Sequence, residues 1–311
     1  MRILVTGARG FVGRHLMAEL AAAGHEPVGL SRQADCPAAD SSDRIADICD
    51  RRAVAEVVRD LQPEGCVHLA GVAFVPAGWT QPHHVFEVNV LGALNLLEAL
   101  REHAPRCRTV LVSSALVYGA ADPDRPRDEQ APLDPQSIYA VSKAASDLNG
   151  LLYARHYDLP VMVARPCNHI GPGQSAEFMA PSFARQLADI ASGRQPAVIR
   201  VGNLDCVREF MDVRDVARAY RMLLERGRGG EAYNVSAGIA GPVRSILEEL
   251  CRIAGVSPRI EIDPARWRPT DRQPLLMADK IRRETGWSPI FPLHQTLADI
   301  YHSMASAVGA S

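Results

Sequence analysis

The stretch RILVTGARGFVGRHLMAELAA at residues 2–22 gives the first indication of how this chain folds. A short apolar run is followed by glycines and then by apolar residues three and four positions apart, which predicts a buried strand, a tight turn and a helix. Glycines in such a turn let the backbone approach a diphosphate and let the helix pack closely against the strand. The stretch therefore predicts a dinucleotide site with these candidate contacts: Gly7, Arg9, Gly10, Phe11, Val12 and Gly13.

Short apolar runs alternate with stretches of helical periodicity through the first half of the chain. We expect strands at residues 2–6, 26–30, 44–48, 66–70, 109–113 and 161–165. Helices are expected at residues 13–23, 50–61, 85–103 and 139–156. This alternation predicts an α/β protein with a doubly wound parallel Rossmann sheet and right-handed crossovers.

The composition of the sequence changes after residue 165. The segments RPCNHIGPGQS and DPARWRPTDRQP are rich in proline and glycine. We expect one unit from residues 1–165 together with about 212–238, which binds the cofactor, and a smaller α+β unit from 166–211 and about 239–311. The second unit is expected to bind the substrate in a cleft beside the sheet.

The bulk composition narrows the function classes. The 311 residues are 47% hydrophobic and 23% charged, with a formal net charge of −2, which fits a globular protein and gives no reason to expect nucleic-acid or membrane-surface binding. The seven scattered cysteines form no C-x-x-C pair and no metal-ligand spacing with histidine, so we expect free thiols and no metal site. The chain has no signal-peptide pattern and no apolar run of about 18 residues, so we expect a cytoplasmic protein.

The second expected strand ends in GLSRQ. Proteins that bind NAD commonly place an acid there for the ribose hydroxyls, whereas this chain has Ser31 and Arg32. A hydroxyl and a guanidinium suit a 2′-phosphate, and Arg9 of the glycine turn is expected to reach the same region. We therefore expect NADP(H) to be preferred, with NAD(H) as the alternative. Asp47 and Ile48, which end the third expected strand, are candidate adenine contacts.

The motif YAVSK places Tyr139 and Lys143 four residues apart, and therefore on one face of the expected helix. A tyrosine has a reference pKa of about 10, and a nearby ammonium group lowers it. Ser114 follows the strand expected at 109–113, at the edge where open α/β sheets bind ligands. Ser114, Tyr139 and Lys143 are therefore the candidate catalytic residues.

These motifs together resemble those of the extended short-chain dehydrogenase/reductase family, which includes nucleotide-sugar epimerases, dehydratases and reductases. The resemblance covers essentially the whole chain and rests on TGARGFVG, HLAG, NVLGALNLLEAL, SSALVYG, YAVSK and RPCNHIGPG. It implies that Ser114 polarises the sugar carbonyl, that Tyr139 donates a proton and that Lys143 tunes Tyr139. It also adds the HLAG residues to the expected cofactor contacts: Leu69, Ala70 and Gly71.

The segment VGNLDCVREFMDVRD resembles that of GDP-mannose 4,6-dehydratases and GDP-4-keto-6-deoxy-D-mannose reductases. The resemblance implies a GDP-sugar substrate and makes the smaller unit a nucleotide-sugar-binding domain. The implied contacts are Asn203 near guanine, Arg208 and Arg268 on phosphates, Asp271 on the ribose hydroxyls, and Asn168 of NHIGPG. Arginine forks suit diphosphate oxygens, and a carboxylate accepts from paired hydroxyls. Glu209 stands where these families more often have aspartate.

The stretch VSSALVYG places Ala115 and Leu116 directly after Ser114. In the dehydratases these positions include a glutamate that removes the C5 proton, so the aliphatic pair excludes a 4,6-dehydratase. Reduction of a 4-keto group remains, as does 4-epimerisation with a tightly bound NAD. Ser31 and Arg32 favour reduction, because a reductase consumes its cofactor at each turnover.

We expect reduction of GDP-4-keto-6-deoxy-D-mannose to GDP-D-rhamnose. The C4 epimer, GDP-6-deoxy-D-talose, stays open because no motif fixes how the sugar ring is presented. GDP-fucose is disfavoured because no convincing Cys/His pair follows Ser114, and a non-enzymatic NADP sensor would not need Tyr139 and Lys143. The helices expected at 85–103 and 139–156 carry apolar residues on more than one face, and the resemblance implies that they pair in a homodimer.

Overall fold

A parallel sheet of seven strands lies at the centre of the computed structural model, which describes residues 1–32, 43–120, 125–267 and 273–309. The strand order is β10-β6-β5-β4-β1-β2-β3. The strands are β1 (Arg2–Thr6), β2 (Glu26–Ser31), β3 (Arg44–Ile45), β4 (Gly65–His68), β5 (Arg108–Val112), β6 (Val161–Pro166) and β10 (Ala232–Val235). The order reverses between β1 and β4, so the carboxyl ends of these strands form the crevice where such sheets bind ligands. The predicted doubly wound fold is confirmed.

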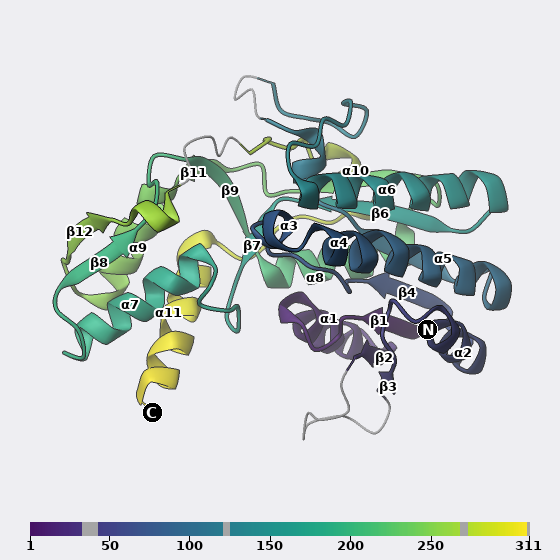
Figure 1. The fold of residues 1–311 in the computed structure, drawn as a ribbon, viewed down its shortest axis with the longest axis horizontal. Coiled ribbons are helices and arrows are strands. Elements are labelled where there is room, and N and C mark those ends of the chain that lie inside the picture. The colour runs from purple at the N-terminus through teal and green to yellow at the C-terminus, as the bar shows by residue number, and fades with distance from the viewer. Residues whose placement is uncertain (33–42, 121–124, 268–272, 310–311) are drawn as a thin grey trace.

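Helices cover both faces of this sheet (Figure 1). Ile3 and Val5 of β1 pack with α1 and α8 on one face, while Leu4 packs with α2 and α5 on the other, as the alternation of a strand requires. The helices of this layer are α1 (Phe11–Ala22), α2 (Arg51–Leu61), α5 (Gly92–His103), α6 (Ile138–Tyr157), α8 (Val213–Arg226) and α10 (Asp279–Thr285). Shorter segments are α3 (Ala77–Thr80), α4 (Pro82–Phe86), the π-helical turn η1 (Glu87–Leu91) and the 3₁₀ turn η2 (Ala115–Tyr118).

A smaller region lies beside the sheet, at the left of Figure 1. It contains a three-stranded sheet, β11-β9-β7, and a two-stranded sheet, β12-β8. Its elements are β7 (Asn168–Ile170), α7 (Met179–Ala191), β8 (Val198–Val201), β9 (Val207–Asp212), β11 (Ala240–Pro242), α9 (Val243–Ala254), β12 (Arg259–Ile262), η3 (Pro264–Arg266) and α11 (Leu293–Gly309). Three of its helices share an apolar cluster that includes Phe183, Leu247 and Leu297.

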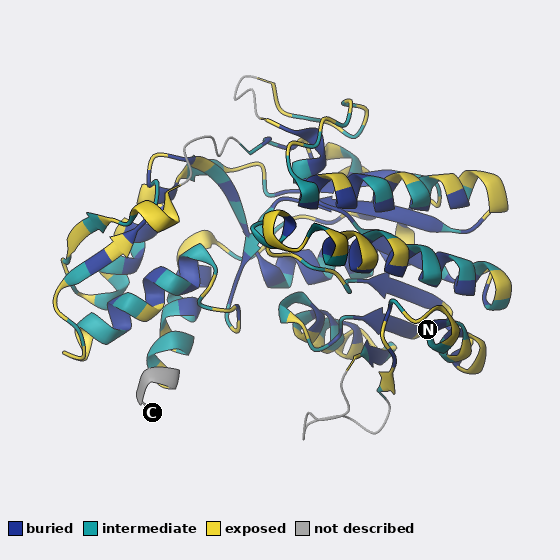
Figure 2. Ribbon diagram, viewed as in Figure 1, coloured by how far each residue is buried: buried dark blue, intermediate teal, exposed yellow. Residues whose placement is uncertain are grey.

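The last part of the chain returns to the central sheet. Ile281 of α10 and the fully buried Trp287 belong to the same apolar cluster as β1 and α8, although the predicted division of the chain assigns residues 239–311 to the smaller unit. That division remains a proposal. Figure 2 shows the central strands buried and the outer sides of the helices exposed. Within the residues that the structure describes, no helix combines the length and apolarity needed to cross a bilayer.

Most element ends differ from the prediction by one or two residues, and two elements differ more. The third strand, expected at 44–48, ends at Ile45 because the chain turns toward α2, where the amide of Asp50 donates to the carbonyl of Asp47 at 2.9 Å. The helix expected at 85–103 is interrupted by the π-helical turn η1. Such turns occur frequently at functional sites.

Candidate active site

The glycine turn between β1 and α1 is built as a backbone cradle. Gly10 is the N-cap of α1, and its amide donates to the carbonyl of Gly7 at 2.9 Å. Gly7 has φ +70°, and a Cβ there would lie 2.9 Å from the amide nitrogen of Ala70. A Cβ on Gly13 would lie 2.3 Å from the carbonyl oxygen of Gly7. The turn therefore depends on glycine, and it presents the N-terminus of α1 to an anion.

The neighbouring HLAG segment is fixed to the same turn. The hydroxyl of Thr6 accepts hydrogen bonds from the amides of Leu69 and Ala70, at 3.2 and 3.1 Å. The same hydroxyl lies 2.8 Å from Nδ1 of the buried His68. The ends of β1 and β4 are thus tied together on either side of the crevice, with the predicted cofactor contacts Leu69 and Ala70 beside it.

The expected 2′-phosphate residues gather at the end of β2. Ser31 has a buried Oγ with no hydrogen-bond partner among the described residues, and Arg32 is exposed. Arg9 forms an ion pair with Asp43 at 3.3 Å, and Asp43 also accepts a hydrogen bond from the amide of Gly29 at 3.2 Å. An unpaired buried hydroxyl that precedes an exposed arginine, with Arg9 tied to the same strand through Asp43, fits an anionic ligand.

The two candidate adenine contacts differ in their surroundings. Asp47 is exposed, and its carboxylate accepts from the amide of Cys49 at 2.9 Å. Ile48 is buried against Gly92 at the start of α5, and its carbonyl accepts from Asn95 at 3.0 Å. Only Asp47 therefore offers an exposed side chain, whereas Ile48 contributes chiefly packing.

Ser114 and Tyr139 meet at the carboxyl edge of β5. Ser114 caps the 3₁₀ turn η2, where its Oγ accepts from the amide of Leu116 at 3.2 Å. Ser137 caps α6 by accepting from the amide of Ala140 at 3.1 Å, which starts the helix just before Tyr139. The hydroxyl of Ser114 lies close enough to Tyr139 to influence the pKa of the phenol. Two separate caps thus bring together hydroxyls that are about 25 residues apart in sequence.

Lys143 lies one turn further along α6 and is also buried. Its ammonium group donates to the carbonyl of Val112, at the end of β5, at 2.7 Å. A Cβ placed on Gly71 would lie 3.6 Å from the same nitrogen. Lys143 therefore sits between the catalytic strand end and the HLAG segment, where an ammonium group can reach a bound cofactor.

The protonation states suit the transfer of a proton to a substrate. Burial raises the pKa of Tyr139 to about 12, and the hydrogen bond with Ser114 opposes this rise. Tyr139 thus keeps its proton at neutral pH, as a general acid must. Burial lowers the pKa of Lys143 to about 8, so the ammonium form still predominates near neutrality. Tuning of Tyr139 by Lys143 remains a prediction.

Asn89 joins this group although its role was not predicted from the sequence. It lies buried in the π-helical turn. Its Oδ1 accepts from the amide of Val72 at 2.7 Å, and its Nδ2 donates to the hydroxyl of Ser142 at 2.9 Å. Asn89 therefore links the segment after β4 to the catalytic helix. The sequence signal that could have identified Asn89 is its position as a polar residue at the start of the largely apolar run NVLGALNLL.

The candidate substrate residues belong to the smaller region. Asn168 starts β7, and its Nδ2 donates to the carbonyl of Glu209 at 3.0 Å and bonds Gln273. Arg208 lies half-buried on β9, opposite Gly241 of β11. Asn203 accepts from the amide of Asp205 at 3.0 Å in the turn between β8 and β9. Arg268 and Asp271 lie outside the described residues.

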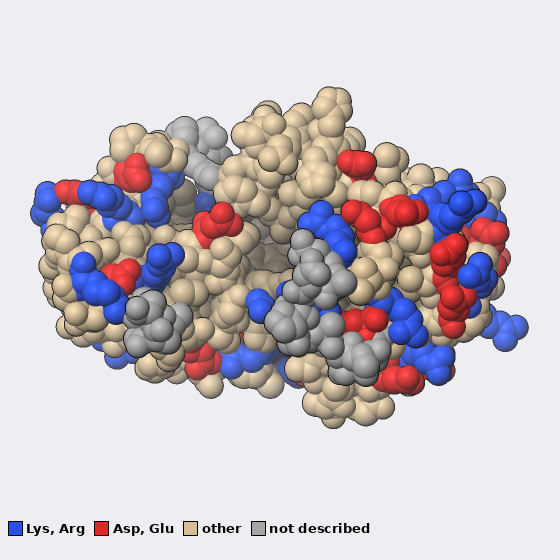
Figure 3. All heavy atoms as spheres, turned by 60° about the horizontal axis from the view of Figure 1, so that its bottom comes forward, with Lys and Arg blue, Asp and Glu red and all other residues tan. Residues whose placement is uncertain are grey.

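Contacts between α1 and the loop after β7 connect the two regions. The ring of Phe11 stacks on His169 with centroids 6.3 Å apart, and His15 bonds the carbonyl of Pro172 at 3.0 Å. Phe11 adjoins the glycine turn and His169 adjoins Asn168, so the predicted cofactor and substrate contacts come from neighbouring elements. Figure 3 shows a hollow near the middle of one face of the molecule, with both acidic and basic side chains on that face.

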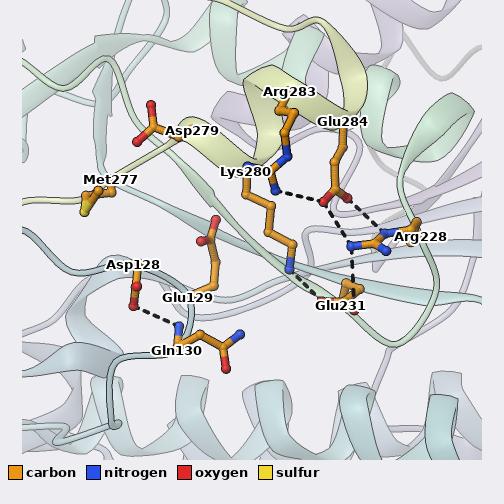
Figure 4. A pocket seen from close by; sticks show the side chains of 10 residues that line it. All are labelled: Asp128, Glu129, Gln130, Arg228, Glu231, Met277, Asp279, Lys280, Arg283 and Glu284. Atoms are coloured by element: carbon orange, nitrogen blue, oxygen red, sulfur yellow. Dashed lines mark hydrogen bonds and ion pairs between the residues drawn. The ribbon is translucent and has the colours of Figure 1, made fainter.

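A second hollow has a different character. It has a volume of about 430 Å³ and lies between α10, the segment 228–231 before β10 and residues 128–130 (Figure 4). Lys280 pairs with Glu231 at 2.6 Å, and Arg228 and Arg283 pair with Glu284. Its three basic residues thus pair with acids of the same lining, and it contains none of the candidate catalytic residues. The described part of the chain also holds no group of three or more His, Cys, Asp or Glu able to bind a metal ion.

One family model and several known proteins match this chain over most of its length. The model of the "NAD dependent epimerase/dehydratase family" matches residues 3–236. The chain is 37% identical over 309 residues to GDP-6-deoxy-D-mannose reductase of Pseudomonas aeruginosa, covering 99% of this chain and 98% of that protein. The structure of RMD from Pseudomonas aeruginosa complexed with NADPH matches with a TM-score of 0.87 at 35% identity, covering 98% of this chain and 99% of the other. UDP-glucose 4-epimerase of Thermus thermophilus, complexed with NAD, matches with a TM-score of 0.86 at 30% identity, covering 99% of this chain and 100% of the other.

Proposed function

Because the chain belongs to the NAD-dependent epimerase/dehydratase family, we propose that it reduces the 4-keto group of GDP-4-keto-6-deoxy-D-mannose and forms GDP-D-rhamnose. It is an oxidoreductase with a nicotinamide cofactor, and its relative from Pseudomonas aeruginosa is named for reduction of a GDP-6-deoxy-sugar. The observation that carries the proposal is the pair of buried side chains Ser114 and Tyr139 at a strand end that is followed by Ala115 and Leu116.

The chain supplies the proton side of the reduction. When bound, the reduced nicotinamide supplies the hydride. Tyr139 donates its phenolic proton to the carbonyl oxygen of the sugar, and Ser114 donates a hydrogen bond to the same oxygen. Together they stabilise the negative charge that develops there. Lys143 holds an ammonium group beside the cofactor segment and fixes the orientation of the nicotinamide ribose.

The same geometry disfavours elimination of water. A 4,6-dehydratase needs a base that removes the C5 proton of the sugar. Ala115, next to the catalytic Ser114, is buried, and Leu116 is half-buried in the 3₁₀ turn. Neither side chain accepts a proton. The stretch therefore supports carbonyl chemistry without dehydration.

The end of β2 supports a preference for NADP(H). The unpaired Oγ of Ser31 can complete its hydrogen bonding with a phosphate oxygen, and Arg32 and Arg9 can supply positive charge. Asp43 pairs with Arg9 at present, so this arginine would share its guanidinium between the carboxylate and the phosphate. NAD(H) remains the alternative cofactor.

The GDP-sugar is proposed to lie across the smaller region, with Asn203 near guanine, Arg208 on the diphosphate and Asn168 toward the sugar. Arg268 and Asp271 are proposed to complete the phosphate and ribose contacts. A 4-epimerase with tightly bound NAD is the second candidate, since UDP-glucose 4-epimerase of Thermus thermophilus shares the fold. Reduction to GDP-6-deoxy-D-talose uses the same residues with the opposite face of the sugar.

A homodimer is proposed from the outer face of α5 and α6. Large apolar side chains are exposed along α6 and in the turn before α5, and such a face fits burial against a second copy. The residues are Leu91, Val141, Leu148, Leu152 and Tyr157. Light scattering of wild type and of a Leu148→Glu, Leu152→Glu variant tests this: a dimer that becomes a monomer supports it, and a monomeric wild type contradicts it.

The function is tested by following NADPH oxidation with GDP-4-keto-6-deoxy-D-mannose. We expect turnover that is faster with NADPH than with NADH at low cofactor concentration. Tyr139→Phe should lower kcat by about 100- to 10,000-fold with NADPH binding preserved. A Tyr139→Phe variant with unchanged turnover contradicts the mechanism, and a KM for NADH at or below that for NADPH contradicts the cofactor preference.

A further inference from the structure

A buried ion pair lies beneath the catalytic helix. Nε of Arg165, on β6, donates to Oδ2 of Asp147 at 2.7 Å, and its Nη2 donates to Oδ1 at 2.9 Å. The side chains are 4% and 0% exposed. Both carboxylate oxygens are therefore held by one planar fork, which fixes direction as well as distance.

The carboxylate belongs to the same helical face as the catalytic residues. Tyr139, Lys143 and Asp147 follow one another at intervals of four, and all three are buried. Asp147 lies about 6 Å along the axis from Lys143, at about 1.5 Å per residue. The fork of Arg165 therefore anchors α6 one turn beyond Lys143 and limits rotation and sliding of the helix.

The remaining arm of Arg165 reaches the other catalytic segment. Its Nη1 donates to the hydroxyl of Tyr118 at 2.8 Å and to the carbonyl of Glu129 at 3.2 Å. Tyr118 closes the 3₁₀ turn that Ser114 begins, and its hydroxyl donates to Oδ1 of Asn234 on β10 at 2.8 Å. One guanidinium group thus contacts the Ser114 turn on one side and the Tyr139 helix on the other.

A gain in stability is a weak explanation for the buried ion pair of Arg165 and Asp147. Buried ion pairs cost desolvation, and well-packed apolar residues of similar volume often replace them without loss of stability. Directional bonds, in contrast, hold two separate segments in one relative geometry, and a misplacement of about 1 Å can cost about 100-fold in rate. Ser114 and Tyr139 need such a fixed geometry to act on one carbonyl oxygen, since they come from different elements.

We propose that Arg165 is a positioning residue, which aligns the Ser114 turn with the Tyr139–Lys143 face of α6 through Tyr118 and Asp147. It acts through these side chains and touches neither substrate nor cofactor in this role. The inference rests on the proposed function for the reaction that is measured, and it adds the physical connection between the two catalytic segments.

The test replaces the pair without leaving an unpaired charge. The double variant Arg165→Met, Asp147→Leu keeps similar volumes and should keep the thermal midpoint within about 5 °C. We expect kcat to fall about 10- to 100-fold, with the KM of the sugar nucleotide and the Kd of NADPH within about threefold of wild type. A larger primary deuterium isotope effect with 4-deuterated NADPH should accompany the loss, because hydride transfer becomes slower.

The matched control is Arg252→Met, Glu249→Leu, which removes an ion pair of α9 held by the same kind of two-bond fork, at 2.8 and 2.7 Å, in the smaller region. Its kcat should stay within about twofold of wild type. A folded Arg165/Asp147 double variant with kcat as high as this control overturns the proposal, as does a loss of rate accompanied by an equal loss of NADPH affinity.

A single, milder substitution tests the same connection if the double variant does not fold. Tyr118→Phe keeps the ion pair and removes only the hydroxyl, so kcat should fall about threefold or more at unchanged KM; wild-type kcat would contradict the connection to Ser114. All values are ratios to wild type. A wild type inactive on GDP-4-keto-6-deoxy-D-mannose refutes the proposed function, and the positioning role is then measured by the same ratios on the nucleotide sugar that it does convert.

Discussion

The lowered pKa of Lys143 predicts how cofactor affinity depends on pH. Burial lowers this pKa from 10.5 to about 8, a shift that corresponds to about 3 kcal/mol against the charged form. The ammonium form is therefore lost as pH rises through about 8. If only the charged form holds the nicotinamide ribose, the Kd of NADPH should be about tenfold higher at pH 9 than at pH 7.

Isothermal titration calorimetry of NADPH between pH 6 and pH 10 measures this dependence. Lys143→Arg keeps a positive charge across the range and should show a flat profile, whereas Lys143→Met should bind weakly at every pH. A wild-type Kd that stays constant from pH 7 to pH 9 would refute the role given to Lys143. The same profile in Lys143→Met and wild type would refute it as well.

The other predictions concern the cradle and the buried polar groups. Gly13→Ala places a methyl group 2.3 Å from the carbonyl oxygen of Gly7, so calorimetry should show NADPH binding weakened by about tenfold or more. The control is Gly24→Ala, which has open space around its Cβ but φ +80°; it should lower stability and leave NADPH binding normal. Tyr220 is fully buried, and among the described residues its hydroxyl has no partner, so Tyr220→Phe should raise the free energy of unfolding in urea by about 1 kcal/mol; a decrease contradicts the unpaired state. Burial lowers the pKa of His68 to about 3, so neutral His68 contributes stability that is present above about pH 6.5 and is lost toward pH 3, at about 1.4 kcal/mol per pH unit. His68→Gln should lose less stability than wild type between pH 6.5 and pH 4.5 in the same assay, and an equal loss counts against this explanation.

The fold could be predicted because its strands, turns and helices follow from local sequence patterns. The strand at residues 2–6 and the helix expected at 139–156 have the predicted places, since apolar periodicity and glycine turns report local geometry directly. The expected position of Ser114 at a strand end followed from the same patterns. The π-helical turn was not predictable, because it depends on Asn89 reaching the backbone of Val72, a contact that exists only once β4 and the helix are packed together.

The other features that could not be predicted are polar contacts between residues far apart in the sequence. The sequence showed Asp147 one helical turn after Lys143 and Arg165 at the end of an expected strand, but nothing local joins them. The pairing of Arg9 with Asp43 likewise depends on how the chain returns beside β2. Such contacts are fixed by tertiary packing, so a sequence pattern supplies the candidates and the structure supplies the partners.

The central claim is that the reduced cofactor delivers hydride to C4 of a GDP-4-keto-6-deoxy-sugar. The most direct measurement is proton NMR of the product formed from GDP-4-keto-6-deoxy-D-mannose and 4-deuterated NADPH. We expect stoichiometric cofactor oxidation and deuterium at C4, and the product of a parallel reaction with unlabelled NADPH should show the H3–H4 and H4–H5 coupling constants of the D-rhamno configuration. Conversion of a UDP- or dTDP-sugar without net NADPH consumption, together with no reaction of the GDP-sugar, would contradict it.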